Sequence, residues 1–245
     1  MVLVRHGEST WIPEGRFQGQ GDPPLSPIGR RQAALAADRL ARSTRSPALP
    51  VMATLIGASL AGPDGSGTAV PRRADPGFLE IGQGDWEGLP TAEVLARWPE
   101  VIAGWRLDPL RWWAPGGESL PEVDARVRAA LVRLLDALGG QGAEAARPDP
   151  GPRSHVLGYG DPGSSAPWSI VVGHDGASKI ALLALLDLPL ERFWSFPFAL
   201  AGISVVEIRA GRPRLRAHNL VDHLAPLESE SGIPGPPDRG RTGAL

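Results

Sequence analysis

The sequence predicts an α/β fold: a three-layer α/β/α sandwich around a mostly parallel sheet. Two short apolar runs, at residues 1–4 and 169–172, have the length and composition of buried strands. Both runs lead into a histidine, His6 after the first and His174 after the second. Ligands of open α/β sheets bind beyond the carboxyl ends of the strands. We therefore expect the two histidines to face one site.

The helices are predicted from their caps and their apolar spacing. Ser26 followed by Pro27 is a typical helix start, and the helix should continue to about residue 42. Ser119 and Glu122 form a capping box. Behind it, apolar residues follow helical spacing at Val123, Val127, Leu131, Leu134 and Leu138. Further helices are expected over residues 90–98 and 177–186, which supply the outer layers.

The remaining segments complete a single domain over residues 1–225. A hairpin is expected around Gly211, from residues 203–209 and 214–217. Residues 139–167 are dense in Gly, Pro, Ala and Ser and predict a flexible insertion within the domain. Residues 226–245 are polar and rich in Gly and Pro, which predicts a disordered tail.

Aromatic residues gather in two places. Four tryptophans are expected to pack a helical lid over the sheet: Trp98, Trp105, Trp112 and Trp113. Residues 192–198 hold Phe193, Trp194, Phe196 and Phe198, which could form a homodimer surface or part of the core. The core is the favoured interpretation of this second segment.

Composition excludes several classes of function. The chain has no cysteine, which excludes disulfides, thiolate zinc sites, iron–sulfur clusters and cysteine nucleophiles. A net charge of −2 gives no basic field that would attract nucleic acid or an anionic membrane. No apolar run reaches membrane-spanning length, and no secretory signal precedes the first strand. A cytoplasmic location is the default expectation.

Four sequence blocks, in this order, carry a resemblance to a known family. They are Val4-Arg5-His6-Gly7-Glu8-Ser9-Thr10-Trp11 with Gly15-Arg16-Phe17-Gln18-Gly19, Leu79-Glu80-Ile81 with Gly84-Asp85-Trp86-Glu87-Gly88, Pro115-Gly116-Gly117-Glu118-Ser119, and Val172-Gly173-His174-Asp175-Gly176. Together they resemble the histidine phosphatase superfamily, which includes phosphoglycerate mutases and small phosphomonoesterases such as α-ribazole phosphatase. The resemblance extends to about His223 and implies a phosphoglycerate mutase-like fold.

The chemistry of phosphoryl transfer gives roles to four residues of these blocks. A phosphomonoester needs cations and N–H donors around its oxygens, and Arg5 can supply a bidentate grip. His6 can attack phosphorus if one ring nitrogen is unprotonated while the other donates to a backbone carbonyl. His174, if protonated, can stabilise the charge on the phosphoryl oxygens. Glu80 matches the family's proton donor, and partial burial between apolar neighbours could raise its pKa for that role.

The same blocks supply candidates for substrate binding: Gly7, Ser9, Gln18, Gly19, Glu118, Asp175 and Gly176. Simpler structural roles compete with these assignments. Gln18 and Gly19 could simply form a turn, and Glu118 could simply favour the start of a helix through the helix dipole. Glu8 is a rival acid, but the orientation of Arg5 or of a neighbouring loop is the favoured role for it.

Two positions depart from the family pattern, Pro50 and Ile12, which stands where related sequences often have Asn. Pro50 stands where the family has a second pocket arginine, within the nearest match at residues 46–54. The loss of one charge-assisted hydrogen bond weakens phosphate binding by about 1.5–3 kcal/mol. Arg42, Arg45 or Arg72 could take the place of this arginine. The departures predict weak or unusual activity, a smaller or less charged substrate, or phosphate binding without turnover.

Hydrolysis of a small phosphomonoester through a phosphohistidine at His6 is the favoured function, with no metal or organic cofactor. A phosphoglycerate-type mutase is the first alternative, but residues 87–113 contain no adjacent arginine pair to hold a bisphosphate. A non-catalytic phospholigand-binding protein is the second, supported by Pro50 and Ile12 and opposed by the intact set of Arg5, His6, Glu80 and His174. A zinc hydrolase is disfavoured because the histidines lack ligand spacing and no His-Glu-x-x-His helix is present. The substrate and the oligomeric state stay open.

Overall fold

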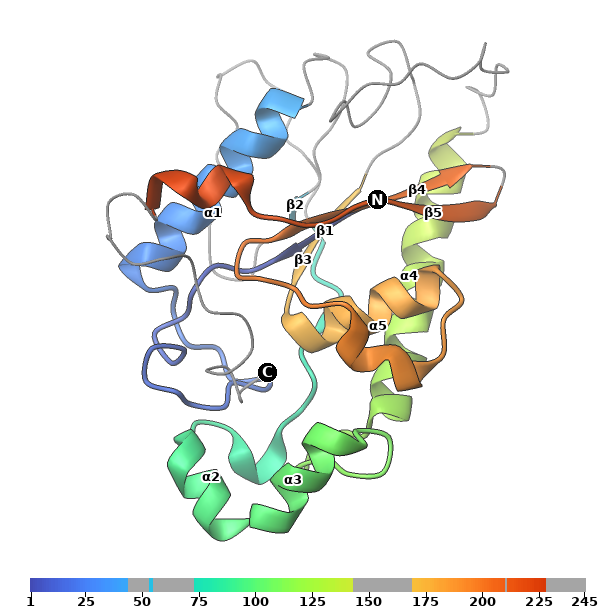
Figure 1. The fold of residues 1–245 in the computed structure, drawn as a ribbon. Helices are drawn as coiled ribbons and strands as arrows, with labels where there is room; N and C mark the ends of the chain where they lie inside the picture. Colours follow the sequence, from blue (N-terminus) through green and yellow to red (C-terminus); the bar gives the residue numbers. More distant parts are fainter. Residues whose placement is uncertain (44–52, 55–72, 143–168, 210, 228–245) are drawn as a thin grey trace.

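The computed structural model describes residues 1–43, 53–54, 73–142, 169–209 and 211–227, and a sheet forms its centre (Figure 1). The strand order is β2-β3-β1-β4-β5. The strands are β1 (Val2–Arg5), β2 (Ala53–Thr54), β3 (Ile170–Gly173), β4 (Ile203–Arg209) and β5 (Arg212–Leu220). β3 is parallel to β1 and β2, whereas β4 is antiparallel to β1 and β5. Among the described strands, β4 alone opposes the others, so the predicted mostly parallel sheet is confirmed.

The two apolar runs of the sequence are the adjacent central strands β1 and β3. Their register pairs Val4 with Val172 and Arg5 with Gly173. The backbone amide of His6 continues the ladder and donates to the Gly173 carbonyl at 2.8 Å. Since the strands are parallel, their carboxyl ends lie at the same edge of the sheet.

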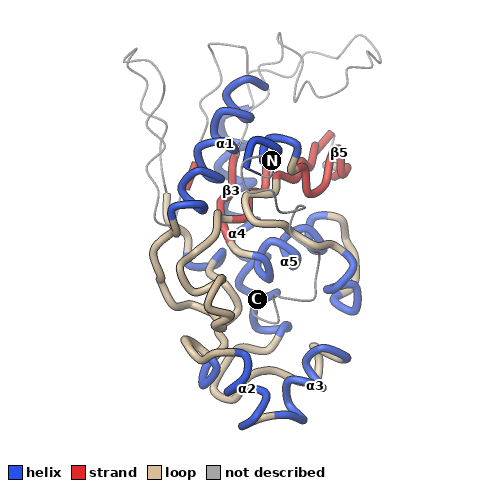
Figure 2. The backbone as a smooth tube through the Cα atoms, turned by 60° about the vertical axis from the view of Figure 1, so that its left-hand side comes forward, coloured by secondary structure: helices blue, strands red, loops and turns tan. Residues whose placement is uncertain are grey.

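Helices cover both faces of this sheet, as Figures 1 and 2 show. Alternate residues of β1 point to opposite faces. Val2 and Val4 pack with Leu40 of α1 (Pro27–Ser43) in one buried cluster. Leu3 belongs to a second cluster, formed with α4 (Leu120–Gly142) and α5 (Asp175–Leu185). The predicted three-layer α/β/α arrangement is therefore confirmed.

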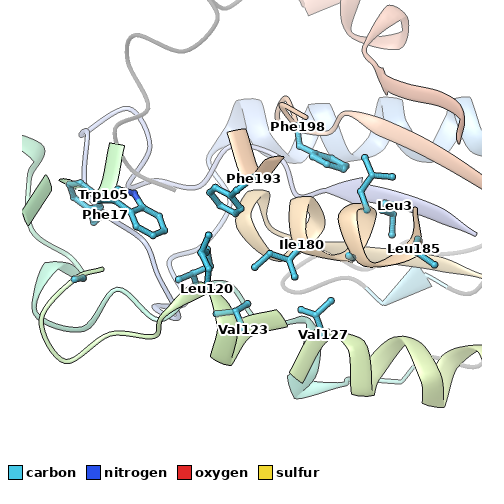
Figure 3. Packing of buried hydrophobic residues seen from close by; sticks show 14 of the residues in the cluster. Leu3, Phe17, Trp105, Leu120, Val123, Val127, Ile180, Leu185, Phe193 and Phe198 are labelled. Atoms are coloured by element: carbon cyan, nitrogen blue, oxygen red, sulfur yellow. The ribbon is translucent and has the colours of Figure 1, made fainter. Parts of the chain in front are cut away.

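The larger cluster lies between α4, α5 and the aromatic segment after α5 (Figure 3). Val123 and Val127 of α4 and Ile180 of α5 are fully buried there. Phe193 joins them from the short helix η3 (Leu190–Ser195), and Phe198 follows it. Both phenylalanines belong to the core, whereas the neighbouring Trp194 is 41% exposed.

The tryptophan-rich segment forms the two short helices α2 (Thr91–Arg97) and α3 (Pro99–Leu107), which lie at the lower end of the molecule in Figure 1. Trp105 anchors them to the core, with its ring centroid 5.9 Å from that of Phe193. Trp112 and Trp113 are partly exposed. Both follow the end of α3, and the Trp112 ring lies against Gly104 of that helix, so the four tryptophans build this helical segment without all being buried.

Several helix boundaries follow from caps. The capping box is confirmed: Ser119 Oγ donates to Glu122 Oε2 at 2.7 Å, and the backbone amide of Glu122 is 3.5 Å from Ser119 Oγ. α5 begins at Asp175, two residues before the predicted start, because His174 has extended backbone and acts as its N-cap. The His174 carbonyl accepts the first helical hydrogen bond, from the Ser178 amide.

α4 continues through Gly142, past the predicted end near residue 138. A glycine weakens a helix by only about 1 kcal/mol, so an established helix can continue through several residues of this kind. The rest of the predicted insertion and the tail from residue 228 lie outside the described residues. The predicted hairpin is confirmed as β4 and β5, with β5 longer than expected.

Short 3-10 helices complete the described chain: η1 (Pro76–Phe78), η2 (Gly84–Trp86) and η4 (Asp222–Leu224). Across the described ranges, no helix combines the length and the apolar character needed to cross a membrane. The loop between η1 and η2 carries Glu80, so η1 and η2 bound one wall of the site described next.

Candidate active site

His6 lies directly after β1, and its ring is oriented by its own backbone. The Nδ1 atom is 2.6 Å from the Gly7 carbonyl oxygen. Because a carbonyl can only accept, Nδ1 must carry the hydrogen, which leaves Nε2 with a free lone pair. Burial, followed by the charges of His174 and Arg5, lowers the pKa of His6 to about 3. The ring is therefore neutral at ordinary pH, with Nε2 in the form of a nucleophile.

His174 faces His6 from the neighbouring strand end. The two ring centroids are 4.9 Å apart, with an angle of 67° between the rings. Burial lowers the pKa of His174 to about 4, helped by the charges of Arg5 and Arg126 and opposed by Asp22. The lowered pKa favours the neutral His174 ring. A bound phosphate dianion would raise its pKa, because an opposite charge favours the cationic ring.

Arg5, the last residue of β1, is buried beside both histidines. Its Nη1 atom donates to the Phe198 carbonyl at 2.6 Å and lies 3.8 Å from Asp175 Oδ1. Its Nε atom is buried without a hydrogen-bond partner among the residues that the structure describes. Arg5 therefore places a fixed positive charge beside both histidines, where it lowers their pKa values.

Glu80 lies in the loop after η1 and is only 2% exposed. Its Oε1 accepts the amides of Ile81 at 2.9 Å and Ala177 at 3.0 Å, and Oε2 accepts that of Gly176 at 3.1 Å. Burial raises the pKa of Glu80, and the charge of Asp175 raises it further against these three donors. The site thus holds one carboxyl that is shifted toward its protonated form.

Two glycines are explained by close approach. A Cβ at Gly7 would lie 2.3 Å from the Gly29 carbonyl oxygen, and one at Gly176 would lie 2.5 Å from Ile81 Cδ1. Gly176 was a substrate-binding candidate, but its amide donates to Glu80. The structure therefore gives Gly176 the role of admitting the Glu80 carboxylate to the start of α5.

Asp175 points to cations of the protein. Its Oδ2 is 2.6 Å from Lys179 Nζ, and its Oδ1 is the atom that lies 3.8 Å from Arg5. The carboxylate would repel a phosphate, so its place between two cations argues against the predicted direct contact with substrate. Sequence reasoning missed Lys179, although an acid and a base four residues apart on a helix are a recognisable pair.

The other substrate-binding candidates have structural partners. Ser9 Oγ donates to Gln18 Oε1 at 2.9 Å, and both side chains are buried. Gly19 has a φ of +55°, and a Cβ there would meet the Glu87 carboxylate. The structure thus favours the turn interpretation for Gln18 and Gly19. Glu8 accepts from Ser26 Oγ at 2.6 Å, which agrees with its expected role in orienting a neighbouring loop.

Glu118 faces the loop that carries Glu80. Its Oε2 accepts the amide of Gly82 at 2.8 Å and the Gln20 side chain at 3.0 Å, while Arg126 donates to both of its oxygens. Burial acts to raise the pKa of Glu118, but the bonds from Arg126 and Gly82 outweigh it and lower the pKa. Glu118 is therefore held as a carboxylate and cannot serve as the acid. Arg126 was missed by sequence reasoning.

The described side chains do not include the candidates for a second pocket arginine. Pro50, Arg45 and Arg72, and the side chain of Arg42, lie outside the described residues. In the part of the chain that is described, no three His, Asp or Glu side chains are grouped as ligands for a metal ion.

The fold and the site are those of an α/β enzyme that acts on phosphate esters. Two histidines lie at adjacent strand ends, beside a buried arginine and a buried carboxyl. The model of the histidine phosphatase superfamily (branch 1) matches residues 1–143 and 162–221. The chain belongs to this superfamily and is a phosphomonoester hydrolase.

Similar proteins carry phosphatase names. Phosphoserine phosphatase 1 of Hydrogenobacter thermophilus is 29% identical over 94% of this chain and 97% of its own length. Glucosyl-3-phosphoglycerate phosphatase of Mycolicibacterium vanbaalenii is 32% identical over 87% and 85%. The solved mycobacterial glucosyl-3-phosphoglycerate phosphatase Rv2419c with VO3 has a TM-score of 0.66 at 26% identity, covering 90% of this chain and 98% of that chain. The α-ribazole phosphatase of Shigella flexneri shares the fold, with a TM-score of 0.68 at 22% identity over 89% and 95%.

Proposed function

We propose that this enzyme hydrolyses small organic phosphomonoesters in two steps, through a phosphohistidine at His6. The observation that carries the proposal is the bond between His6 Nδ1 and the Gly7 carbonyl, in a ring with a pKa of about 3. In the first step, Nε2 attacks phosphorus, the N–P bond forms, and the ester P–O bond breaks. A neutral, oriented imidazole can do this without a separate base.

Arg5 and His174 hold the phosphoryl group in this proposal. The charge of Arg5 acts on both histidines, and the His174 ring is close enough to His6 to contact the same group. The first amides of α5 donate to Glu80. Side chains, rather than these two amides, therefore supply the donors to the phosphoryl oxygens.

Glu80 moves the protons. As the P–O bond breaks, the Glu80 carboxyl gives its proton to the leaving alkoxide oxygen. In the second step, the carboxylate takes a proton from water, whose oxygen attacks phosphorus and releases inorganic phosphate from His6. The pKa of Glu80 is raised, whereas the pKa values of Glu118, Glu122 and Asp75 are lowered. This contrast favours Glu80 as the acid.

The substrate in this proposal is a small phosphorylated compound, and the names of the relatives supply the first two to test, phosphoserine and glucosyl-3-phosphoglycerate. Neither a nucleic acid nor a membrane is part of the proposal. Cytoplasmic residence and assembly as a homodimer stay predictions.

The test is hydrolysis of p-nitrophenyl phosphate in excess chelator by the parent protein, His6→Ala and the control His218→Asn. We expect activity in the parent and the control, loss in His6→Ala, and an acid-labile, alkali-stable phosphoryl-enzyme trapped only when His6 is present. Activity in His6→Ala, or loss of parental activity on chelation, would refute the proposal. Phosphate binding by a parent protein that turns over no substrate would favour the non-catalytic alternative.

A further inference from the structure

Arg126 uses every N–H of its guanidinium within the protein. Nε donates to Glu118 Oε1 at 2.8 Å, and Nη2 donates to Glu118 Oε2 and to the Glu80 carbonyl, both at 2.7 Å. Nη1 donates to the carbonyls of Gly77 at 3.1 Å and Leu79 at 2.7 Å. An arginine has five such donors, so all of them are engaged.

The three carbonyls belong to one short segment, residues 77–80, which delivers Glu80 to the site. This segment has only the 3-10 turn of η1 and no place in the sheet. Its carbonyls therefore lack the partners that a strand would provide, and one rigid guanidinium on α4 takes that role. The contacts lie on the backbone that directly precedes the Glu80 side chain.

Glu118 extends the same support to the other side of Glu80. It accepts the amide of Gly82 while Arg126 holds both of its oxygens. Gln20 closes the arrangement, since its Nε2 donates to Glu118 Oε2 and to the Glu80 carbonyl. The backbone is therefore fixed at positions 77, 79 and 80 on one side and at 82 on the other.

The charge of Arg126 is felt at His174, where it helps to lower the pKa of the ring. The guanidinium is thus near the site, but it has no N–H left for a substrate oxygen. This combination separates Arg126 from Arg5, whose Nε has no partner among the described residues.

We propose that Arg126, held by Glu118, is the positioning residue for Glu80: it fixes the backbone that aims this carboxyl at the leaving oxygen. The inference rests on the assignment of Glu80 as the acid in the proposed function. Proton transfer requires the acid within about 2.6–3.2 Å of the leaving oxygen. Loss of the Arg126 hydrogen bonds would leave the Glu80 carboxyl present but displaced. A misplacement of about 1 Å can reduce a rate by about 100-fold.

The test compares two leaving groups in Arg126→Met. A nitrophenolate is a weak base and departs without a proton, whereas the alkoxide of an alkyl phosphate such as phosphoserine needs one. We expect kcat/KM for the alkyl phosphate to fall by about 100-fold and kcat/KM for the nitrophenyl phosphate to fall much less. Inhibition by inorganic phosphate should not weaken, because Arg126 does not contact the phosphoryl group and loss of its charge makes His174 easier to protonate.

Arg133→Met is the matched control. Arg133 lies on the same helix and donates to Asp75 at 2.7 Å, just before the segment, but it makes no contact with Glu80. It should leave both rates unchanged. Two milder variants are Arg126→Lys, which keeps the charge but has fewer donors, and Glu118→Gln. Both should show smaller losses of kcat/KM, and the loss should again be greater for the alkyl phosphate than for the nitrophenyl phosphate. These two milder variants give the answer if Arg126→Met does not fold.

Equal losses on the two substrates, or weaker inhibition by phosphate, would overturn the inference and make Arg126 a stabilising or phosphate-binding residue. Glu80→Gln separates the two levels of the argument. If Glu80→Gln is selective for leaving group and the Arg126 variants are not, only the positioning role fails. If Glu80→Gln itself shows no selectivity, the assignment of the acid fails and the positioning role falls with it.

Discussion

Replacing Lys179 by Met should destabilise the protein strongly, because it leaves Asp175 as a buried charge with a weaker partner. Lys179 is only 5% exposed, and its ammonium lies 2.6 Å from Asp175 and 4.9 Å from the centre of the Trp194 ring. Breaking a buried ion pair from one side costs about 3–5 kcal/mol. Arg5 stays 3.8 Å from the same carboxylate, so we expect the lower end of that range, about 3 kcal/mol.

A loss of that size lowers the melting temperature of a chain of this length by about 6–12 °C. Urea unfolding of the parent and of Lys179→Met measures the free energy directly. The carboxylate should also turn toward Arg5 and weaken its grip on phosphate, so the inhibition constant for inorganic phosphate should rise.

The double variant Asp175→Asn/Lys179→Met tests the cause. It removes the buried charge, so it should be more stable than Lys179→Met alone, with a coupling energy within about 0.5–3 kcal/mol. The reasoning is refuted if Lys179→Met costs less than about 1 kcal/mol, or if the double variant is no more stable than the single one.

Three further predictions concern the same site. First, kcat/KM for an alkyl phosphate should fall as pH rises through the raised pKa of Glu80, because the acid must be protonated. On the acid side, kcat/KM should fall only as pH drops toward about 3, where His6 becomes protonated. pH–rate profiles of the parent and of Glu80→Gln check this, since the variant should lack the alkaline fall. Second, Gly176→Ala should cost about 1–3 kcal/mol in urea unfolding, since its Cβ would lie 2.5 Å from Ile81 Cδ1, and an unchanged free energy would contradict the close packing. Third, the pKa of His174 falls from 6.5 in the unfolded chain to about 4 in the folded one. Its contribution to the free energy of unfolding is therefore present above pH 6.5 and is lost as pH drops toward 4. His174→Asn should reduce the pH dependence of the free energy of unfolding in that window by up to about 1.4 kcal/mol per pH unit.

Sequence reasoning reached the parts of the fold that depend on local pattern. A few adjacent residues are enough to predict the strands before His6 and His174 and the helix start at Ser119. The meeting of His6 and His174 at one site followed from one general rule about strand ends. The orientation of His6 by a neighbouring carbonyl could be stated in advance because its partner is the next residue.

What could not be predicted depends on distant partners and on burial. A helix pattern pairs Arg126 with Glu122 four residues before it, yet the structure pairs it with Glu118 and with a loop that sequence spacing does not connect to α4. The neutral state of His174 likewise follows from burial and nearby charges, which a single sequence does not display. Gly176 was a substrate-binding candidate because the sequence does not show that its amide bonds to the distant Glu80.

The place of β1 has a consequence for how the enzyme is made. The strand that ends at Arg5 lies between β3 and β4, both of which come from the last third of the chain. During synthesis at about 5–20 residues per second, β1 therefore waits on the order of 10 s for its first neighbour. Until then its apolar residues have no lateral partner, and His6 has no His174 opposite it. Phosphatase activity consequently arises only after β3 and β4 have been made and have paired with β1.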